Sequence, residues 1–133
     1  FYDESSRYTS YVGRWREGQR HGKGTLYDRR HKVAYEGEWK HDKRDGEGEM
    51  TFPDGSRYKG QWLAGLQHGR GVCSFASGTV SYIGSVKSGF ADGNGTSYDE
   101  RGQKEYIGQW RMNQWHGRGT RFYPDGSKYT GQW

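Results

Sequence analysis

Histidine and aspartate residues alternate at a regular spacing along this chain, and both residue types can bind metal ions or transfer protons. They are His21, Asp45, His68, Asp92 and His116, one every 23 or 24 residues. Metal ligands must converge to about 2 Å from one ion, whereas the same place in successive two-stranded units is expected about 10 Å apart, since strands lie about 4.8 Å from each other. We therefore interpret them as polar turn residues that hydrogen-bond their own loops, and we expect no metal site.

No other catalytic signature is present in the sequence. A Gly-x-Ser-x-Gly motif is absent, and the Gly-x-Gly pairs lack both a third glycine and the Lys and Ser/Thr of a phosphate-binding loop. The single cysteine excludes an intrachain disulfide. Cys73 stands where other repeats carry Leu26 and Met50, which predicts a small buried apolar side chain. The sequence thus predicts a protein that is not an enzyme, with no catalytic residue, no cofactor and no small-molecule substrate.

The elements that carry these residues are copies of one short unit. The pattern Tyr-x-Gly-x-Trp begins at Tyr11, Tyr35, Tyr58, Tyr106 and Tyr129, with a degraded copy at Tyr82. A fixed period of this length predicts a stack of small supersecondary units. We expect full repeats, numbered 1 to 5, over 11–34, 35–57, 58–81, 82–105 and 106–128, the tail of a preceding repeat over 1–10, and a partial repeat over 129–133. We also expect the chain to be a segment of a longer array, because it has no initial Met.

Each repeat predicts two strands and two turns. Position n is defined here as the residue n places after the tyrosine of its repeat. Position 7 is Gly, Asp or Asn, and Asp-Gly or Ser-Gly occurs at positions 19 and 20 of several repeats, which are residue types of tight turns. A helix of ordinary length has no room, and no 3.6-residue periodicity supports one. The expected fold is all-β, an elongated single-layer ribbon of stacked antiparallel hairpins.

Aromatic rings form the predicted core. The mean hydropathy of −1.28 would indicate disorder, but 17% of the residues are aromatic, and disordered chains are poor in aromatics. Positions 0, 2 and 4 of a strand share one face, and folding about the first turn is expected to set position 4 opposite 11 and position 2 opposite 13. Each tryptophan would then lie over a glycine. The predicted core residues are Tyr11, Trp15, Tyr35, Trp39, Tyr58, Trp62, Tyr82, Tyr106, Trp110, Tyr129 and Trp133.

Repeats 1 and 4 depart from the pattern. Val86 replaces the tryptophan of repeat 4, and the second-strand aromatics Tyr27 and Tyr98 fall at position 16, whereas their counterparts in the other repeats fall at position 17. A slip of one residue turns a side chain to the opposite face unless a bulge absorbs it. Irregular second strands are therefore expected in repeats 1 and 4.

The segment from Tyr106 to Gly119, followed by Tyr123-Pro-Asp-Gly126, closely resembles the membrane occupation and recognition nexus repeat, or MORN repeat. The resemblance covers essentially the whole chain. It implies a scaffold of cytoskeletal, ciliary or flagellar, or membrane-junction structures, some members of which form dimers. For some members it implies binding to phosphoinositide headgroups.

The first-turn loops, at positions 5 to 9, differ along the array and supply the candidate binding residues. Turn residues are ordinarily polar, so apolar ones in repeats 3 to 5 form a candidate partner-binding patch, unless they fold back to cap the core. The basic ones in repeats 1 and 2 form a candidate lipid-binding site, or an ordinary solvated edge, since Glu17, Asp42 and Asp45 offset part of their charge. The partner-binding candidates are Leu63, Leu66, Phe90, Met112 and Trp115, and the lipid-binding candidates are Arg16, Arg20, Lys40, Lys43 and Arg44.

Three functions remain compatible with the sequence. The leading one is a non-catalytic scaffold that presents an extended surface to a protein partner or to a second copy of itself, as a homodimer. The alternatives are peripheral attachment to anionic membrane lipids and a regulatory appendage of an enzyme outside this segment.

Charge and targeting signals narrow these functions only slightly. The net charge of +5 permits acidic partners without requiring them. No nucleic-acid partner is expected, because the aromatics needed for base stacking belong to the core. We expect a cytoplasmic location, associated with cytoskeleton, cilium or membrane, since no apolar run of membrane-spanning length and no signal peptide occurs.

Overall fold

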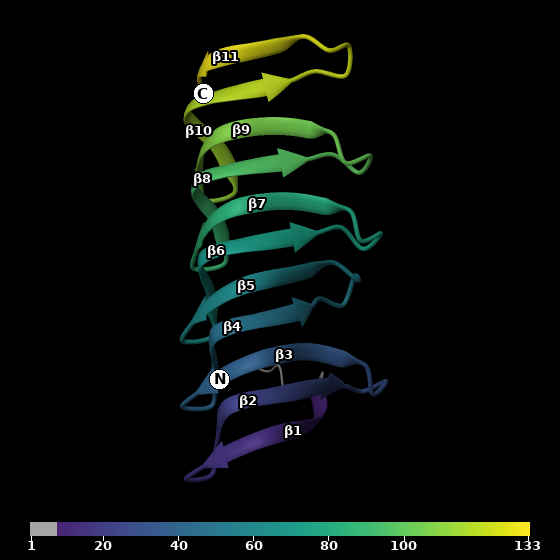
Figure 1. Ribbon diagram of the computed structural model, residues 1–133, viewed down its shortest axis with the longest axis vertical. Coiled ribbons are helices and arrows are strands. Elements are labelled where there is room, and N and C mark those ends of the chain that lie inside the picture. Colours follow the sequence, from purple (N-terminus) through teal and green to yellow (C-terminus); the bar gives the residue numbers. More distant parts are fainter. Residues whose placement is uncertain (1–7) are drawn as a thin grey trace.

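The described residues, 8–133 of the computed structural model, form one antiparallel sheet in which each strand pairs with its neighbours in sequence (Figure 1). The expected all-β ribbon of hairpins is confirmed. Most of the predicted tail, over 1–10, lies outside the described residues. The eleven strands are β1 (Tyr8–Arg16), β2 (Gln19–Asp28), β3 (Val33–Lys40), β4 (Lys43–Thr51), β5 (Arg57–Leu63), β6 (Leu66–Ser74), β7 (Val80–Lys87), β8 (Phe90–Tyr98), β9 (Lys104–Arg111), β10 (Gln114–Phe122) and β11 (Lys128–Gln132).

The two strands of each repeat are joined by a two-residue turn at positions 6 and 7. Both residues have positive φ, for example 51° at His41 and 68° at Asp42, as in the type I′ turns that suit the twist of a hairpin. The turn predicted at position 7 is therefore present. Consecutive repeats are joined by longer loops closed by two backbone bonds, such as Phe52 N to Ser56 O at 2.8 Å and Gly55 N to Phe52 O at 2.9 Å.

The strand register confirms one predicted pairing and corrects the other. Position 2 does lie opposite position 13, as Gly37 opposite Gly48. Within its own hairpin, the residue at position 4 lies opposite position 9 and not position 11, as Trp39 opposite Arg44. Trp39 does lie opposite a position-11 glycine, but this is Gly22 of the preceding repeat. The two-residue turn dictates this register, and the two extra residues of the second strand form a bulge that contains the position-11 glycine, whose φ is positive in every repeat.

The ring that covers the glycines is the tyrosine, not the tryptophan. A Cβ atom added at Gly48 would collide with the Tyr35 ring, whose hydroxyl donates a hydrogen bond to the Glu38 carbonyl at 2.9 Å. The tryptophans stand edge-on between tyrosines. Trp62 lies 5.3 Å from Tyr58 of its own repeat and 5.4 Å from Tyr35 of the preceding one.

Burial follows this arrangement. Tyr35, Tyr58 and Tyr106 are fully buried. Three predicted core residues are exposed instead: Trp15, Tyr129 and Trp133. They lie at the first and last strands of the sheet, where a neighbouring strand covers only one side.

The pairing between consecutive repeats is irregular where the first of the two has 24 residues. Register shifts fall between Leu26 and Tyr27 in repeat 1 and between Ser97 and Tyr98 in repeat 4, as predicted. A third shift follows Cys73 in repeat 3 and was not predicted. Repeats 2 and 5 have 23 residues, and their second strands pair with the next repeat without a shift. The register shift between consecutive repeats, which is separate from the bulge at position 11, therefore accommodates the additional residue.

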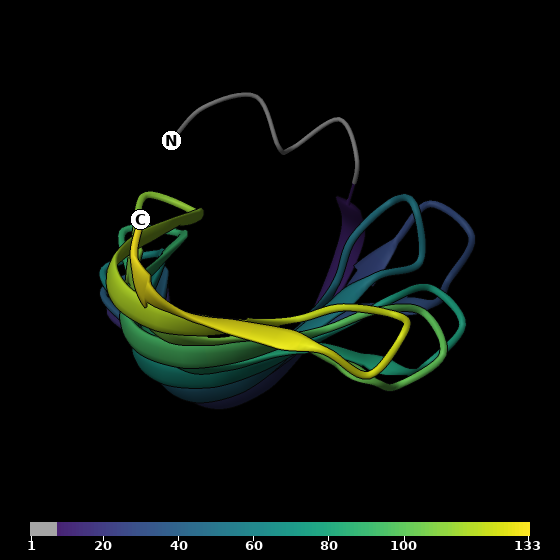
Figure 2. The ribbon, with the colours of Figure 1, turned by 90° about the horizontal axis from the view of Figure 1, so that it is seen from above.

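The sheet is curved into an open trough, seen along its length in Figure 2. The first turns curl over the side that carries the C-terminal Trp133, and the longer loops project on the other side. The described residues contain no helix long and apolar enough to cross a membrane.

Candidate binding site in the trough

Side chains at position 9 of repeats 1, 2 and 5 lie over aromatic rings. The Arg20 guanidinium carbon lies 4.4 Å from the centroid of the Trp39 ring, and that of Arg44 lies 5.1 Å from the Trp62 ring. In repeat 5 the same position is Trp115, which stacks on Tyr106 at 4.9 Å with an interplanar angle of 8°. Two of the predicted lipid-binding arginines are thus packed on the core through cation–π contacts.

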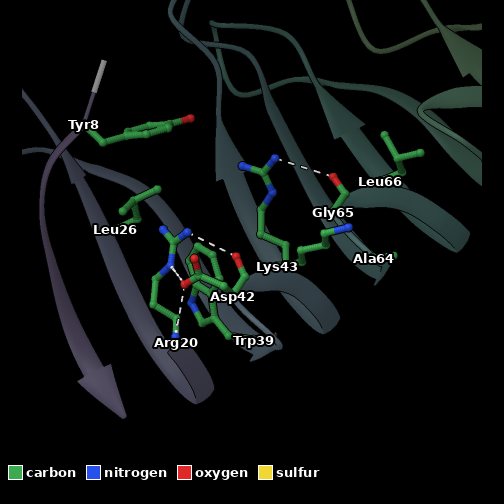
Figure 3. Close-up of a pocket in the computed structure, with 10 residues that line it drawn as sticks. Tyr8, Arg20, Leu26, Trp39, Asp42, Lys43, Ala64, Gly65 and Leu66 are labelled. Carbon is green, nitrogen blue, oxygen red and sulfur yellow. Dashed lines mark hydrogen bonds and ion pairs between the residues drawn. The ribbon is translucent and has the colours of Figure 1, made fainter. Parts of the chain in front are cut away.

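Arg20 also joins the first turns of repeats 1 and 2. Its Nε donates to Asp42 Oδ1 at 2.6 Å and its Nη2 donates to the Asp42 carbonyl at 3.1 Å (Figure 3). In return, the Asp42 amide donates to the Arg20 carbonyl at 3.1 Å. Burial would raise the pKa of Asp42, but the hydrogen bonds and charge of Arg20 outweigh it and hold that pKa below its ordinary value.

Arg44 is buried at the equivalent place one repeat further on. Only 9% of its surface is exposed, its Nη2 lies 3.5 Å from the Gly65 carbonyl, and its Nη1 lies 3.6 Å from the Met50 sulfur. Arg20 and Arg44 therefore carry positive charge into the trough and do not present it at the tips of the turns.

A cavity of about 240 Å³ lies between these two arginines, under the first turns of repeats 2 and 3 (Figure 3). Leu26, Trp39 and Leu66 supply apolar surface, and Lys43 adds a third basic group. Tyr8 faces them from β1. This volume is below the range of about 300 to 1,000 Å³ typical of small-molecule sites, and suits one large side chain of a partner.

The structure divides the predicted basic set. Arg20, Lys43 and Arg44 line the cavity, while Arg16 and Lys40 lie outside it on exposed ends of β1 and β3. Lys40 stands opposite Lys43 across the turn. The packing of position 9 was missed because the register error placed position 4 opposite a glycine, so nothing indicated that Arg20 or Arg44 would meet a ring.

The predicted apolar set divides as well. Leu63 and Leu66 stand opposite each other on the turn of repeat 3 and are 52% and 53% exposed. Phe90 and Met112 are also exposed, on the turns of repeats 4 and 5. Trp115 instead caps the core, packing on Tyr106 and, at 5.1 Å, on Trp133.

The histidines and aspartates at position 10 recur along the array, one in each full repeat. Among residues 8–133, no group of three or more His, Cys, Asp or Glu side chains is placed to hold an ion. Asp45 accepts a hydrogen bond from Ala64 N at 3.0 Å, and Asp92 accepts one from Met112 N at 3.4 Å. These bonds reach the turn of the following repeat, which corrects the expectation that they would stay within one loop.

Cys73 is half-buried, and burial raises the pKa of its thiol to about 11. Few of these thiols are therefore ionised near neutral pH, and the thiolate is the reactive form. This placement suits the predicted role of a small apolar side chain in the trough floor.

Two-stranded units that pair with their neighbours in sequence and together form a continuous trough define a repeat protein of the β-solenoid class. The MORN repeat family model matches residues 11–30, 35–57, 58–80, 82–104 and 106–128, most of the chain, so the chain belongs to the MORN repeat family. Comparison with curated proteins gives no match.

Proposed function

We propose that this chain is a non-catalytic interaction module whose trough binds an extended segment of a partner protein. MORN repeats are in general modules for protein or membrane interaction. The observation that supports a protein segment is the cavity lined by Leu26, Trp39 and Leu66, which has the size of one side chain. Membership of a cytoskeletal, ciliary or membrane-junction assembly is part of the same proposal.

The surroundings of the cavity favour a peptide with an apolar anchor beside an acidic residue. Arg44 and Lys43 line the cavity beside the Arg20–Asp42 pair, so a carboxylate next to the anchor would meet favourable charge. Exposed apolar side chains continue along the rim at Leu63, Phe90 and Met112, and they extend the apolar surface past the cavity.

Selection of random peptides displayed on phage, with residues 1–133 immobilised, tests the proposal. Wild-type protein should enrich a family of peptides that share an apolar anchor. Leu66→Asp should reduce the affinity of these peptides at least tenfold, because Leu66 lines the cavity. Leu63→Asp is the matched control: Leu63 has the same turn and nearly the same exposure but is not among the cavity-lining residues.

Two outcomes would contradict the proposal. Absence of any enriched peptide would remove the cavity as a peptide site. Equal loss of affinity in Leu63→Asp and Leu66→Asp would move the contact from the cavity to the rim.

Binding to anionic lipid is a second candidate, supported by the adjacent Lys40 and Lys43 at the tip of one turn. Sedimentation with phosphatidylcholine vesicles that contain a phosphoinositide would test it. Binding should fall when Lys40 and Lys43 are changed to Gln, and should weaken as salt is raised. Binding unaffected by both changes would exclude this turn as the lipid site.

Binding of a second copy of the same chain is a further candidate function. Light scattering at several protein concentrations measures the solution mass directly. A dimer that dissociates in Phe90→Ser or Met112→Ser would assign the exposed apolar turns to self-association, and a monomer at every concentration would leave them for another protein.

A further inference from the structure

One side chain in the trough floor departs from the chemistry of its equivalents. Position 15 lies in the row that alternates with the tyrosines across the sheet, and its other members are apolar or small: Leu26, Met50, Cys73 and Ser97. In repeat 5 this position is Arg121, which pairs with Tyr106 on one side and Tyr129 on the other. A charged group therefore occupies a place where four repeats have none.

The Arg121 guanidinium lies beside two aromatic rings. Its central carbon lies 5.0 Å from the centroid of Trp115 and 4.9 Å from that of Tyr123. Trp115 is itself fixed by stacking on Tyr106. Contacts with two rings restrict the orientation of the planar group, which lowers the entropy that binding of an anion would cost.

The charge of Arg121 has no protein counterpart in the described part of the chain. Its Nε atom is buried without a hydrogen-bond partner, and no ion pair to Arg121 occurs within residues 8–133. Arg20, by contrast, is paired with Asp42 at 2.6 Å. A bound carboxylate would give Arg121 the ion pair that the described residues do not supply.

We propose that Arg121 binds the carboxylate of an acidic residue in an extended peptide that lies along the trough, which rests on the proposed function above. A carboxylate matches the paired donors of a guanidinium. A peptide can reach the floor of the trough, whereas the first turns, which curl over one side of it, hinder the approach of a flat membrane surface (Figure 2).

The test follows the side-chain Nε–Hε resonances of ¹⁵N-labelled protein during titration with acetyl-Val-Glu-Val-Glu-Val-amide. The Arg121 resonance should shift and saturate with a dissociation constant on the order of 1 mM, as expected for one ion pair with a few flanking contacts. The matched peptide with Gln in place of Glu should produce no saturable shift. Phosphoinositide vesicles form a separate arm and should leave the Arg121 resonance unchanged.

Three variants distinguish the contributions of the charge and the shape of the Arg121 side chain to peptide binding from an effect on folding. Arg121→Met introduces the residue that repeat 2 carries at this position, Met50, so the fold should be retained and the response of the Trp115 indole resonance to the peptide lost. Arg121→Lys should weaken binding several-fold, because an ammonium group cannot form the paired contact. Arg118→Met is the control, since Arg118 lies exposed on the opposite face of the same strand, and it should bind as wild type.

The proposal is overturned if the Glu and Gln peptides shift Arg121 alike, if neither does, or if only the vesicles do. Equal binding by Arg121→Met and wild type would overturn it too. Should Arg121→Met fail to fold, the comparison of the two peptides on wild-type protein still decides. If the Arg121 resonance shifts and saturates but no peptide is enriched on phage, the carboxylate site is retained and the cavity is rejected as a peptide site. If peptides are enriched but the Arg121 resonance does not shift, only the carboxylate site is rejected.

Discussion

The indole Nε1 of Trp62 donates a hydrogen bond of 3.1 Å to the carbonyl of Gly48, a residue of the preceding repeat. The same bond joins Trp39 to Gly24 at 3.2 Å and Trp110 to Gly95 at 3.0 Å. Where a repeat carries the tryptophan at position 4, its indole thus adds a side-chain bond to the preceding repeat, as at Trp39, Trp62 and Trp110.

Trp62→Phe should lower the free energy of unfolding by about 2 kcal/mol, since it removes this hydrogen bond and part of a buried ring. Urea unfolding measures the change. Trp15→Phe is the control, because Trp15 is 58% exposed, and it should change stability by less than about 0.5 kcal/mol. Equal losses in the two variants would show that the inter-repeat bond contributes nothing.

Gly48→Ala should destabilise the protein by about 3 kcal/mol or prevent folding, because the added methyl group would occupy the space of the Tyr35 ring. Gly18→Asn provides the comparison. Gly18 has open space around it and a φ of 78°, and Asn113 already holds the equivalent turn position with a φ of 68°, so its cost should stay below about 1 kcal/mol. Thermal unfolding of both variants measures the difference, and similar midpoints would contradict the close packing of tyrosine on glycine.

Repeat 4 should be attached more weakly than its neighbours. Val86 replaces the tryptophan there, so β6 and β7 lack the indole-to-carbonyl bond that joins β4 to β5 and β8 to β9. Amide hydrogen exchange in the β6–β7 pair should report an opening free energy about 1 kcal/mol lower than in the β4–β5 pair. Equal protection of the two pairs would mean that Val86, which is well buried, compensates by packing.

Alkaline pH should destabilise the fold through the buried tyrosines. Burial, assisted by the negative charge that Cys73 would carry, raises the pKa of Tyr82 to about 12, compared with about 10 in an unfolded chain. The folded state then holds the proton more tightly, so this contribution to stability is complete below about pH 10 and is lost as pH rises toward 12. Unfolding midpoints across this range should fall, and Tyr82→Phe should fall less steeply; identical slopes would contradict the shift.

Cys73 should react slowly with iodoacetamide while the protein is folded. Burial raises the pKa of the thiol from 9.0 to about 11, which reduces the thiolate fraction near pH 8 by about a hundredfold. Mass spectrometry after timed alkylation, with and without urea, measures the ratio. A folded rate close to the unfolded rate would show that the trough floor opens to the reagent.

The repeat period, the turns at position 7 and the facing glycines such as Gly37 and Gly48 could be predicted from sequence, because each depends on local backbone preferences. The partner of each ring could not. The tyrosine and tryptophan of a repeat share one strand face, and alternation alone does not say which ring lies flat on Gly48. That choice depends on the two-residue turn and the bulge at Gly46, which together move Trp39 from a glycine to Arg44.

The candidate site shows the same limit. Arg20 and Arg44 look like exposed turn residues in a list of charges, and only the corrected register brings them over Trp39 and Trp62. A signal for Arg121 was present, since it is the one charged residue at position 15 among the five full repeats. Its contact with Trp115 depends on position 9, where no other full repeat carries an aromatic residue.

Because register shifts between consecutive repeats take up the extra residue of the longer repeats, repeats of 23 and 24 residues occupy the same two strands of sheet. The separation of two points along the trough is then set by the number of strands between them. Arg44 lies on β4 and Arg121 on β10, so six strand spacings, about 29 Å, separate them along the axis of the trough. An extended peptide advances about 3.3 Å per residue, so a partner that fills the cavity and reaches Arg121 must place its apolar anchor and its distant acidic residue about nine positions apart. That spacing can be sought in the sequences of candidate partners before any binding experiment.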